Sequence, residues 1–80
     1  MVEQLLNEVT KIVHEVLGDN QISIKDNLYQ FGMNSLSFIN IIVDIEKKYN
    51  ICFPAESLDG EICNTIYDIC LIIEAQIKQV

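Results

Sequence analysis

A serine, Ser35, stands where a polar loop gives way to a strongly apolar segment, within the sequence QFGMNSLSFINIIVDIEKKY of residues 30–49. A serine hydroxyl becomes a strong nucleophile when a neighbouring base takes its proton. No residue near Ser35 in the sequence could do so, and we therefore expect no hydrolase-type triad around it. Ser35 or Asn34 could instead cap a helix, because either side chain accepts a hydrogen bond from a first-turn N–H group.

Few other side chains offer chemistry. His14 lies in an apolar-periodic stretch without a catalytic partner, and we interpret it as a surface or half-buried helix residue. Cys52, Cys63 and Cys70 are odd in number and form no CxxC pair, which argues against a disulfide framework or a zinc site. We interpret them as buried apolar thiols of a reducing compartment. Because metalloprotease, phosphate-loop and calcium-loop motifs are also missing, we expect neither a metal site nor enzymatic activity.

Three segments have the apolar spacing of amphipathic helices, namely residues 3–17, 35–50 and 65–78. A single short helical turn is expected near Glu56 to Leu58, and no segment is a convincing strand. We expect residues 18–34 to form a long ordered loop that is pinned to the core by Ile22, Ile24, Leu28 and Phe31. A loop of this length usually has a functional reason or hides a short helix. The pattern predicts an all-α protein, a small four-helix bundle with three long helices and one short one.

Composition narrows the classes of partner. The 80 residues make one domain, 1–80, and carry a net charge of -7. Nucleic acids and anionic membranes repel such a surface, so we expect protein partners, preferably basic ones. The N-terminus lacks a basic signal-peptide region, and no apolar run is long enough to span a bilayer. We expect a cytoplasmic monomer without membrane insertion. A chain that begins with Met suits a free-standing protein, although an excised domain would look the same.

The segment after Ser35 is more apolar than one buried face requires. At ~100° per residue, its apolar arc covers well over half of the helix circumference. Leu36 and Val43 lie on one edge of that arc, close to Ser35, which is typical of a contact site. Phe38 lies in mid-arc, and both a core position and an exposed position stay open for it. Residues 35–53 contain two acids and two lysines, whereas both flanking segments are acidic.

The sequence NLYQFGMNSLSFINIIVDIEKKYNICFP, residues 27–54, resembles the central segment of acyl carrier and peptidyl carrier proteins. The match rests on Phe31 and Gly32, then two residues, and then the pair Ser35 and Leu36 at a helix start. Pro54 after the helix also fits, and NTIYDI, residues 64–69, resembles the start of the family's fourth helix. The resemblance covers nearly the whole chain.

The resemblance implies that a phosphopantetheinyl transferase attaches 4'-phosphopantetheine from coenzyme A to Ser35. The thiol of this arm would hold acyl or aminoacyl groups as thioesters and present them to loading and condensing enzymes. Asn34 would stay available as a cap. The partner-contact residues that we assign on this basis are Leu36, Val43, Asn34, Met33 and Phe38.

Two departures from the family pattern bear on the pathway. Many acyl carriers have Asp before the serine, where this chain has Asn34, and carriers of fatty acid synthesis resemble one another in a strongly acidic second helix. We therefore favour a carrier of polyketide or nonribosomal peptide biosynthesis over a fatty acid or D-alanyl-type carrier. Two other classes stay open: an unmodified, carrier-like interaction module, and a small enzyme or regulator that uses a cysteine or His14.

Overall fold

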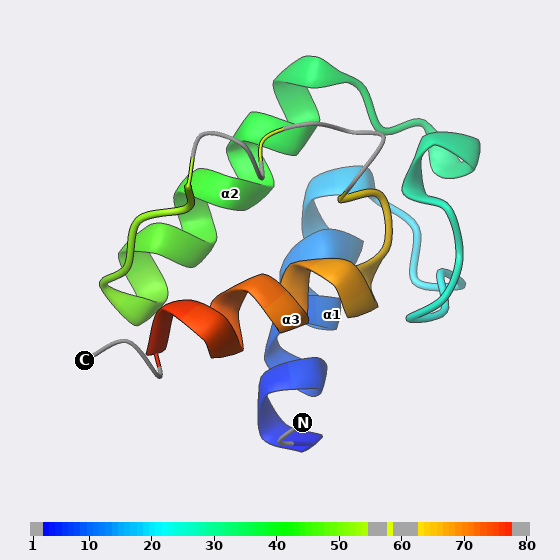
Figure 1. The fold of residues 1–80 in the computed structure, drawn as a ribbon. Helices are drawn as coiled ribbons and strands as arrows, with labels where there is room; N and C mark the ends of the chain where they lie inside the picture. The colour runs from blue at the N-terminus through cyan, green and yellow to red at the C-terminus, as the bar shows by residue number, and fades with distance from the viewer. Residues whose placement is uncertain (1–2, 55–57, 59–62, 78–80) are drawn as a thin grey trace.

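The computed structural model of the chain describes residues 3–54, 58 and 63–77. These residues form three α-helices, α1 (Glu3–Leu17), α2 (Ser35–Tyr49) and α3 (Ile66–Ile77) (Figure 1). A 3-10 helix, η1 (Leu28–Phe31), precedes α2. No strand occurs in this described part, which confirms the all-α class. Within the same ranges, no helix is both long enough and apolar enough to cross a bilayer.

The helix ends agree closely with the sequence pattern. α1 has the predicted bounds, and α2 ends one residue early because Asn50 adopts a left-handed conformation with φ 54°. The Asn50 N–H donates to the carbonyl of Glu46, which closes the last turn. The short helix expected from Glu56 to Leu58 lies outside the described residues, apart from Leu58. The described chain thus has three α-helices and one 3-10 helix, and the fourth helix of a bundle stays a prediction.

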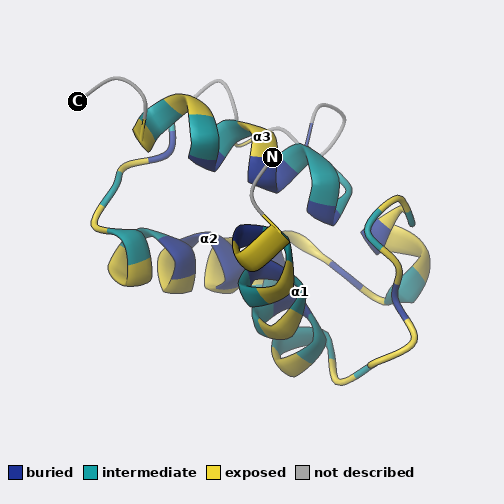
Figure 2. Cartoon of the chain, turned by 90° about the horizontal axis from the view of Figure 1, so that it is seen from below, coloured by how far each residue is buried: buried dark blue, intermediate teal, exposed yellow. Residues whose placement is uncertain are grey.

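The helix α1 is the central element, because it packs against both α2 and α3. In Figure 2, α3 lies above α1 and α2 extends to its left, and the buried faces of α2 and α3 turn toward the interior. Among the described residues the buried core is entirely apolar, and it includes one face of each helix. These helical core residues are Leu5, Val9, Val13, Phe38, Ile41, Ile42, Ile45, Ile66, Ile69, Cys70 and Ile73.

The loop between α1 and α2 is pinned to this core, and it also contains η1. Ile22 and Leu28 are buried, while Ile24 and Phe31 pack partly against the same cluster. The carbonyl of Ile22 accepts a hydrogen bond from His14 Nε2 at 2.9 Å. The four predicted side chains thus pack against the core, but the 3-10 helix η1 interrupts the segment, so an uninterrupted long loop is not confirmed.

Candidate functional site

The approach to α2 begins with a sharp turn at Gly32. This residue follows η1 and has φ 92°, a left-handed conformation that residues with a side chain rarely adopt. Apart from its two chain neighbours, no atom of the described residues lies within 4 Å of the position that a Cβ would take, so the backbone conformation rather than space demands glycine. The N–H of Gly32 and the N–H of Met33 both donate to the carbonyl of Leu28. The turn delivers the chain to Asn34 in an extended conformation.

Asn34 and Ser37 cap the start of α2 reciprocally. Asn34 Oδ1 accepts a hydrogen bond from the Ser37 N–H at 3.0 Å, and Ser37 Oγ accepts one from the Asn34 N–H at 2.8 Å. This is a capping box, which satisfies two backbone donors that the helix itself leaves without partners. Of the two caps that the sequence allowed, Asn34 is therefore the one used.

Ser35 is the first residue of α2, and its side chain is exposed. Within the described part of the chain, its hydroxyl makes no hydrogen bond, because Asn34 and Ser37 form the cap. No acidic residue occupies the first turn of α2, where aligned peptide dipoles favour an anion. A phosphoryl group esterified to this hydroxyl would thus face solvent, break no existing hydrogen bond and lie in a favourable field. The residues present fit a covalently attached phosphate-linked group.

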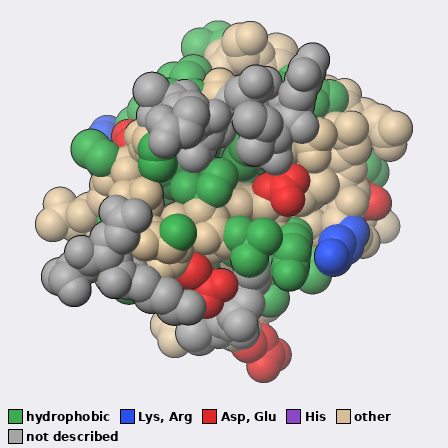
Figure 3. All heavy atoms as spheres, in the orientation of Figure 1, with side chains coloured by type: hydrophobic (Ala, Val, Ile, Leu, Met, Phe, Trp, Pro, Cys, Tyr) green, Lys and Arg blue, Asp and Glu red, His purple; other side chains and the backbone are tan. Residues whose placement is uncertain are grey.

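An apolar stripe runs along α2 from Ser35. Leu36 is 72% exposed and Val43 is 37% exposed, so the structure leaves both of these predicted contact residues accessible. Ile39 is 44% exposed and lies between them at helical spacing. Ile39 was not among the contact residues predicted from the sequence. Apolar side chains reach the surface near the start of α2, at the top of Figure 3. We refer to Leu36, Ile39 and Val43 as the apolar stripe.

Two of the assigned contact residues lie in the core instead. Met33 and Phe38 are each only 4% exposed. The turn at Gly32 directs Met33 inward, and Phe38 shares the buried face of α2 with Ile41 and Ile45. For Phe38 the core alternative is therefore correct. In this structure neither side chain is available to a partner, and we do not retain them as contact residues.

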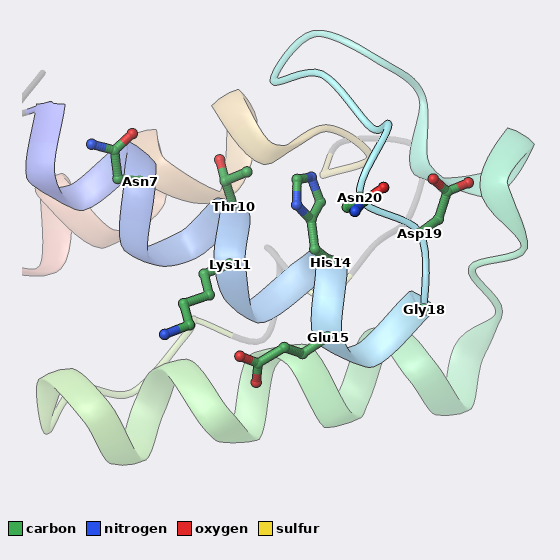
Figure 4. Close-up of a pocket in the computed structure, with 8 residues that line it drawn as sticks. All are labelled: Asn7, Thr10, Lys11, His14, Glu15, Gly18, Asp19 and Asn20. Carbon is green, nitrogen blue, oxygen red and sulfur yellow. The ribbon is translucent and has the colours of Figure 1, made fainter.

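His14 lies at a polar groove and is distant in sequence from Ser35. The groove is open and runs beside α1 from Asn7 to its end, with the side chain of His14 directed toward the following loop (Figure 4). Its lining residues are Asn7, Thr10, Lys11, His14, Glu15, Gly18, Asp19 and Asn20. His14 is half-buried and holds the loop through Ile22, which agrees with the structural interpretation of this residue.

The cysteines divide into two kinds. Cys63 and Cys70 are buried, as predicted, and all three thiols are free. Burial raises the pKa of the Cys63 thiol to about 12, with Asp68 contributing, and burial raises that of Cys70 to about 11, with Glu74 contributing. Both are therefore protonated and unreactive at neutral pH. Cys52 is exposed, so its assignment to the interior was wrong.

Comparison with known proteins shows which family the chain belongs to. Residues 7–73 match the model of a family described as Phosphopantetheine attachment site. The chain is also similar to proteins named Gramicidin S synthase 2 from Brevibacillus brevis and Aneurinibacillus migulanus. Each is 38% identical over 55 residues, which make up 69% of this chain and only 1% of the relative. These matches confirm the resemblance found in the sequence: the chain belongs to the phosphopantetheine attachment site family and is a carrier domain, a class whose prosthetic group is covalent 4'-phosphopantetheine.

Proposed function

We propose that the chain carries acyl or aminoacyl groups as thioesters on a 4'-phosphopantetheine arm attached to Ser35. The observation that carries this proposal is the exposed hydroxyl of Ser35 at the first position of α2, left unused by the capping box of Asn34 and Ser37. Carrier domains of this family are not catalytic themselves, and we propose the same for this chain. A phosphopantetheinyl transferase would activate the hydroxyl, since the carrier supplies no base beside it in sequence.

The proposed docking surface is the apolar stripe, with Asn34 beside it. Exposed apolar patches commonly mark sites of contact with other proteins, and this patch lies close in sequence to the proposed attachment residue. Two of the four charged side chains of α2 are already engaged: the Glu46 carboxylate accepts from the Phe53 N–H at 2.8 Å, and Lys48 lies 3.7 Å from Glu8. Little charge is left along α2, so docking of the transferase and of the loading and condensing enzymes would depend mainly on apolar contact.

The proposed pathway is nonribosomal peptide synthesis. Its support is the name of the two relatives, Gramicidin S synthase 2, together with the neutral second helix. Polyketide, fatty acid and D-alanyl-type carriers share the same attachment chemistry and are the alternatives. We propose a monomer in the cytoplasm, where the three free thiols would stay reduced.

Intact mass spectrometry tests the attachment. The purified protein is incubated with coenzyme A, magnesium and a phosphopantetheinyl transferase of broad specificity. We expect a gain of one phosphopantetheine, lost in Ser35→Ala and kept in Ser37→Ala, a matched variant two residues away that removes part of the cap. A folded wild-type protein that gains no mass would overturn the proposal and favour an unmodified interaction module.

A further inference from the structure

The loop that leads to Ser35 is fastened to the start of α3. The Leu28 N–H donates to the Asn64 carbonyl at 2.8 Å, and the Tyr67 N–H donates to the Ile24 carbonyl at 3.0 Å. The second of these bonds satisfies a first-turn donor of α3 that the helix itself leaves without a partner. The next donor, the Asp68 N–H, is satisfied locally by Thr65 Oγ1 at 3.0 Å. The loop therefore completes the cap of α3.

A side-chain contact reinforces this junction. Lys25 Nζ lies 3.9 Å from the centre of the Tyr67 ring, within the range of a cation–π interaction. Lys25 is otherwise exposed, and Tyr67 is half-buried. Tyr67 donates the backbone hydrogen bond to Ile24, and Lys25 is the next residue after Ile24. We call this junction the latch, formed by Ile24, Lys25, Leu28, Asn64 and Tyr67.

Hydrogen bonds of Leu28 link the latch to the turn that leads to Ser35. Leu28, which is fully buried and begins η1, donates its N–H to the carbonyl of Asn64, just before α3. Its carbonyl accepts from Gly32 and from Met33, the residues that direct the chain into the capping box. The start of η1 is thus tied to the segment before α3, and the same residue is tied to the turn that leads into α2.

We propose that Lys25 and Tyr67 are positioning residues for the modification of Ser35. They hold η1 in place, so that η1 and the start of α2 form one preorganised surface for the transferase. This inference rests on the proposed function of Ser35. Loosening the latch leaves the hydroxyl and its reaction unchanged, but the transferase must then order the loop as it binds. Loosening the latch should raise KM and leave kcat unchanged, because the cost of ordering the loop is the same in the bound carrier and in the transition state.

Hydrogen exchange tests the latch without any modification. In Lys25→Gln and Tyr67→Leu, we expect the amide exchange rates of Leu28 and Met33 to rise about two- to fivefold, the factor that a cation–π contact at an exposed site represents. Lys25→Arg and Tyr67→Phe keep the cation and the ring, and should restore the wild-type rates. Lys11→Gln makes the same change of charge on α1 and should have no effect on these amides.

Transfer kinetics test the consequence for Ser35. With coenzyme A and a transferase of broad specificity, Lys25→Gln should raise KM for the carrier about two- to fivefold at unchanged kcat, and Lys25→Arg should restore it. The Lys11→Gln variant is the control. If the wild-type protein acquires the arm but all variants have the same KM, only the positioning role would be overturned. A wild-type protein that acquires no arm would overturn the proposed function, and the positioning role with it.

Discussion

Asn34 and Ser37 bind each other's backbone N–H groups, at 3.0 Å and 2.8 Å, across Ser35, the residue that we propose as the attachment point. The capping box therefore encloses Ser35 without using its hydroxyl. A serine at the start of a helix often serves as the cap itself, and its hydroxyl oxygen then accepts a hydrogen bond from the first turn. Here neighbouring residues take over the cap, which lets Ser35 stay exposed on an ordered backbone.

Replacing the cap tests this division of roles. Asn34→Ala should lower the free energy of unfolding by about 1 kcal/mol, or the melting temperature by roughly 5 °C for a chain of this size. Asn34→Asp keeps the accepting oxygen and should retain wild-type stability, as measured by circular dichroism on heating. The control is Asn40→Ala, an exposed position within α2 that caps nothing. Equal melting temperatures for Asn34→Ala and Asn40→Ala would contradict the role of the cap.

Leu36→Asp and Val43→Asp test the apolar stripe. Because both side chains are exposed, we expect each variant to keep its helical spectrum and to lose less than about 0.5 kcal/mol of stability. The KM for the carrier in phosphopantetheine transfer should rise roughly tenfold, since a charge replaces apolar contact at the interface. Ile45→Asp, a change at a fully buried position on the same helix, should instead unfold the protein. Unfolding by either stripe variant would contradict the assignment.

Tyr49 and Glu8 join the end of α2 to α1, with Tyr49 Oη donating to Glu8 Oε1 at 2.6 Å. Tyr49→Phe should cost about 1 kcal/mol, measured by urea unfolding at neutral pH. Tyr29→Phe, at an exposed position, is the matched control and should cost nothing measurable. A Tyr49→Phe variant as stable as Tyr29→Phe would show that the hydrogen bond does not contribute.

The same pair makes stability depend on alkaline pH. Burial, and then the Glu8 carboxylate, raise the pKa of Tyr49 above its ordinary value of 10.0. The unfolded chain therefore loses the phenolic proton first, and this contribution is complete below pH 10 and declines as pH rises through the raised pKa. The stability difference between wild type and Tyr49→Phe should be constant up to about pH 10 and shrink above it. A difference that stays constant further into the alkaline range would contradict the raised pKa.

Thiol alkylation distinguishes the three cysteines. At pH 8 the unmodified, folded protein should take up a single iodoacetamide adduct, at exposed Cys52, and three adducts in denaturant. Cys63 and Cys70 are fully buried, and their pKa values of about 12 and about 11 leave almost no thiolate. Peptide mass mapping would locate the adduct. Rapid second and third adducts on the folded protein would contradict the burial of these thiols.

Periodicity predicted the helices because each of them has a single buried face against a common core. Glu3–Leu17 has this pattern without interruption, so both of its ends were predicted correctly. The end of α2 was predicted to within one residue, since the left-handed terminator Asn50 is a local property of the chain. Ser35 could be proposed as the attachment residue for a similar reason: its motif is local, with the glycine turn and the helix start adjacent in sequence.

Exposure could not be predicted in the same way, because it depends on where other helices pack. Ile39 and Ile42 both lie in the apolar arc of α2, yet only Ile42 faces the core. Met33 is next to exposed residues in sequence and is nevertheless buried by the turn at Gly32. The latch was missed for a related reason, since nothing near Lys25 in sequence indicates that it will meet Tyr67. Contacts between distant segments are set by tertiary packing.

The unused hydroxyl of Ser35 also has a consequence for turnover of the protein. Attaching a group there removes no hydrogen bond, and a phosphodiester at the start of α2 adds an anion worth about 0.3–1 kcal/mol of helix stabilisation. Degradation in cells follows the population of opened molecules. That stabilisation corresponds to a factor of about two to five in this population. If the proposed arm is attached, we therefore expect proteases to degrade copies without the arm about two- to fivefold faster than copies that carry it.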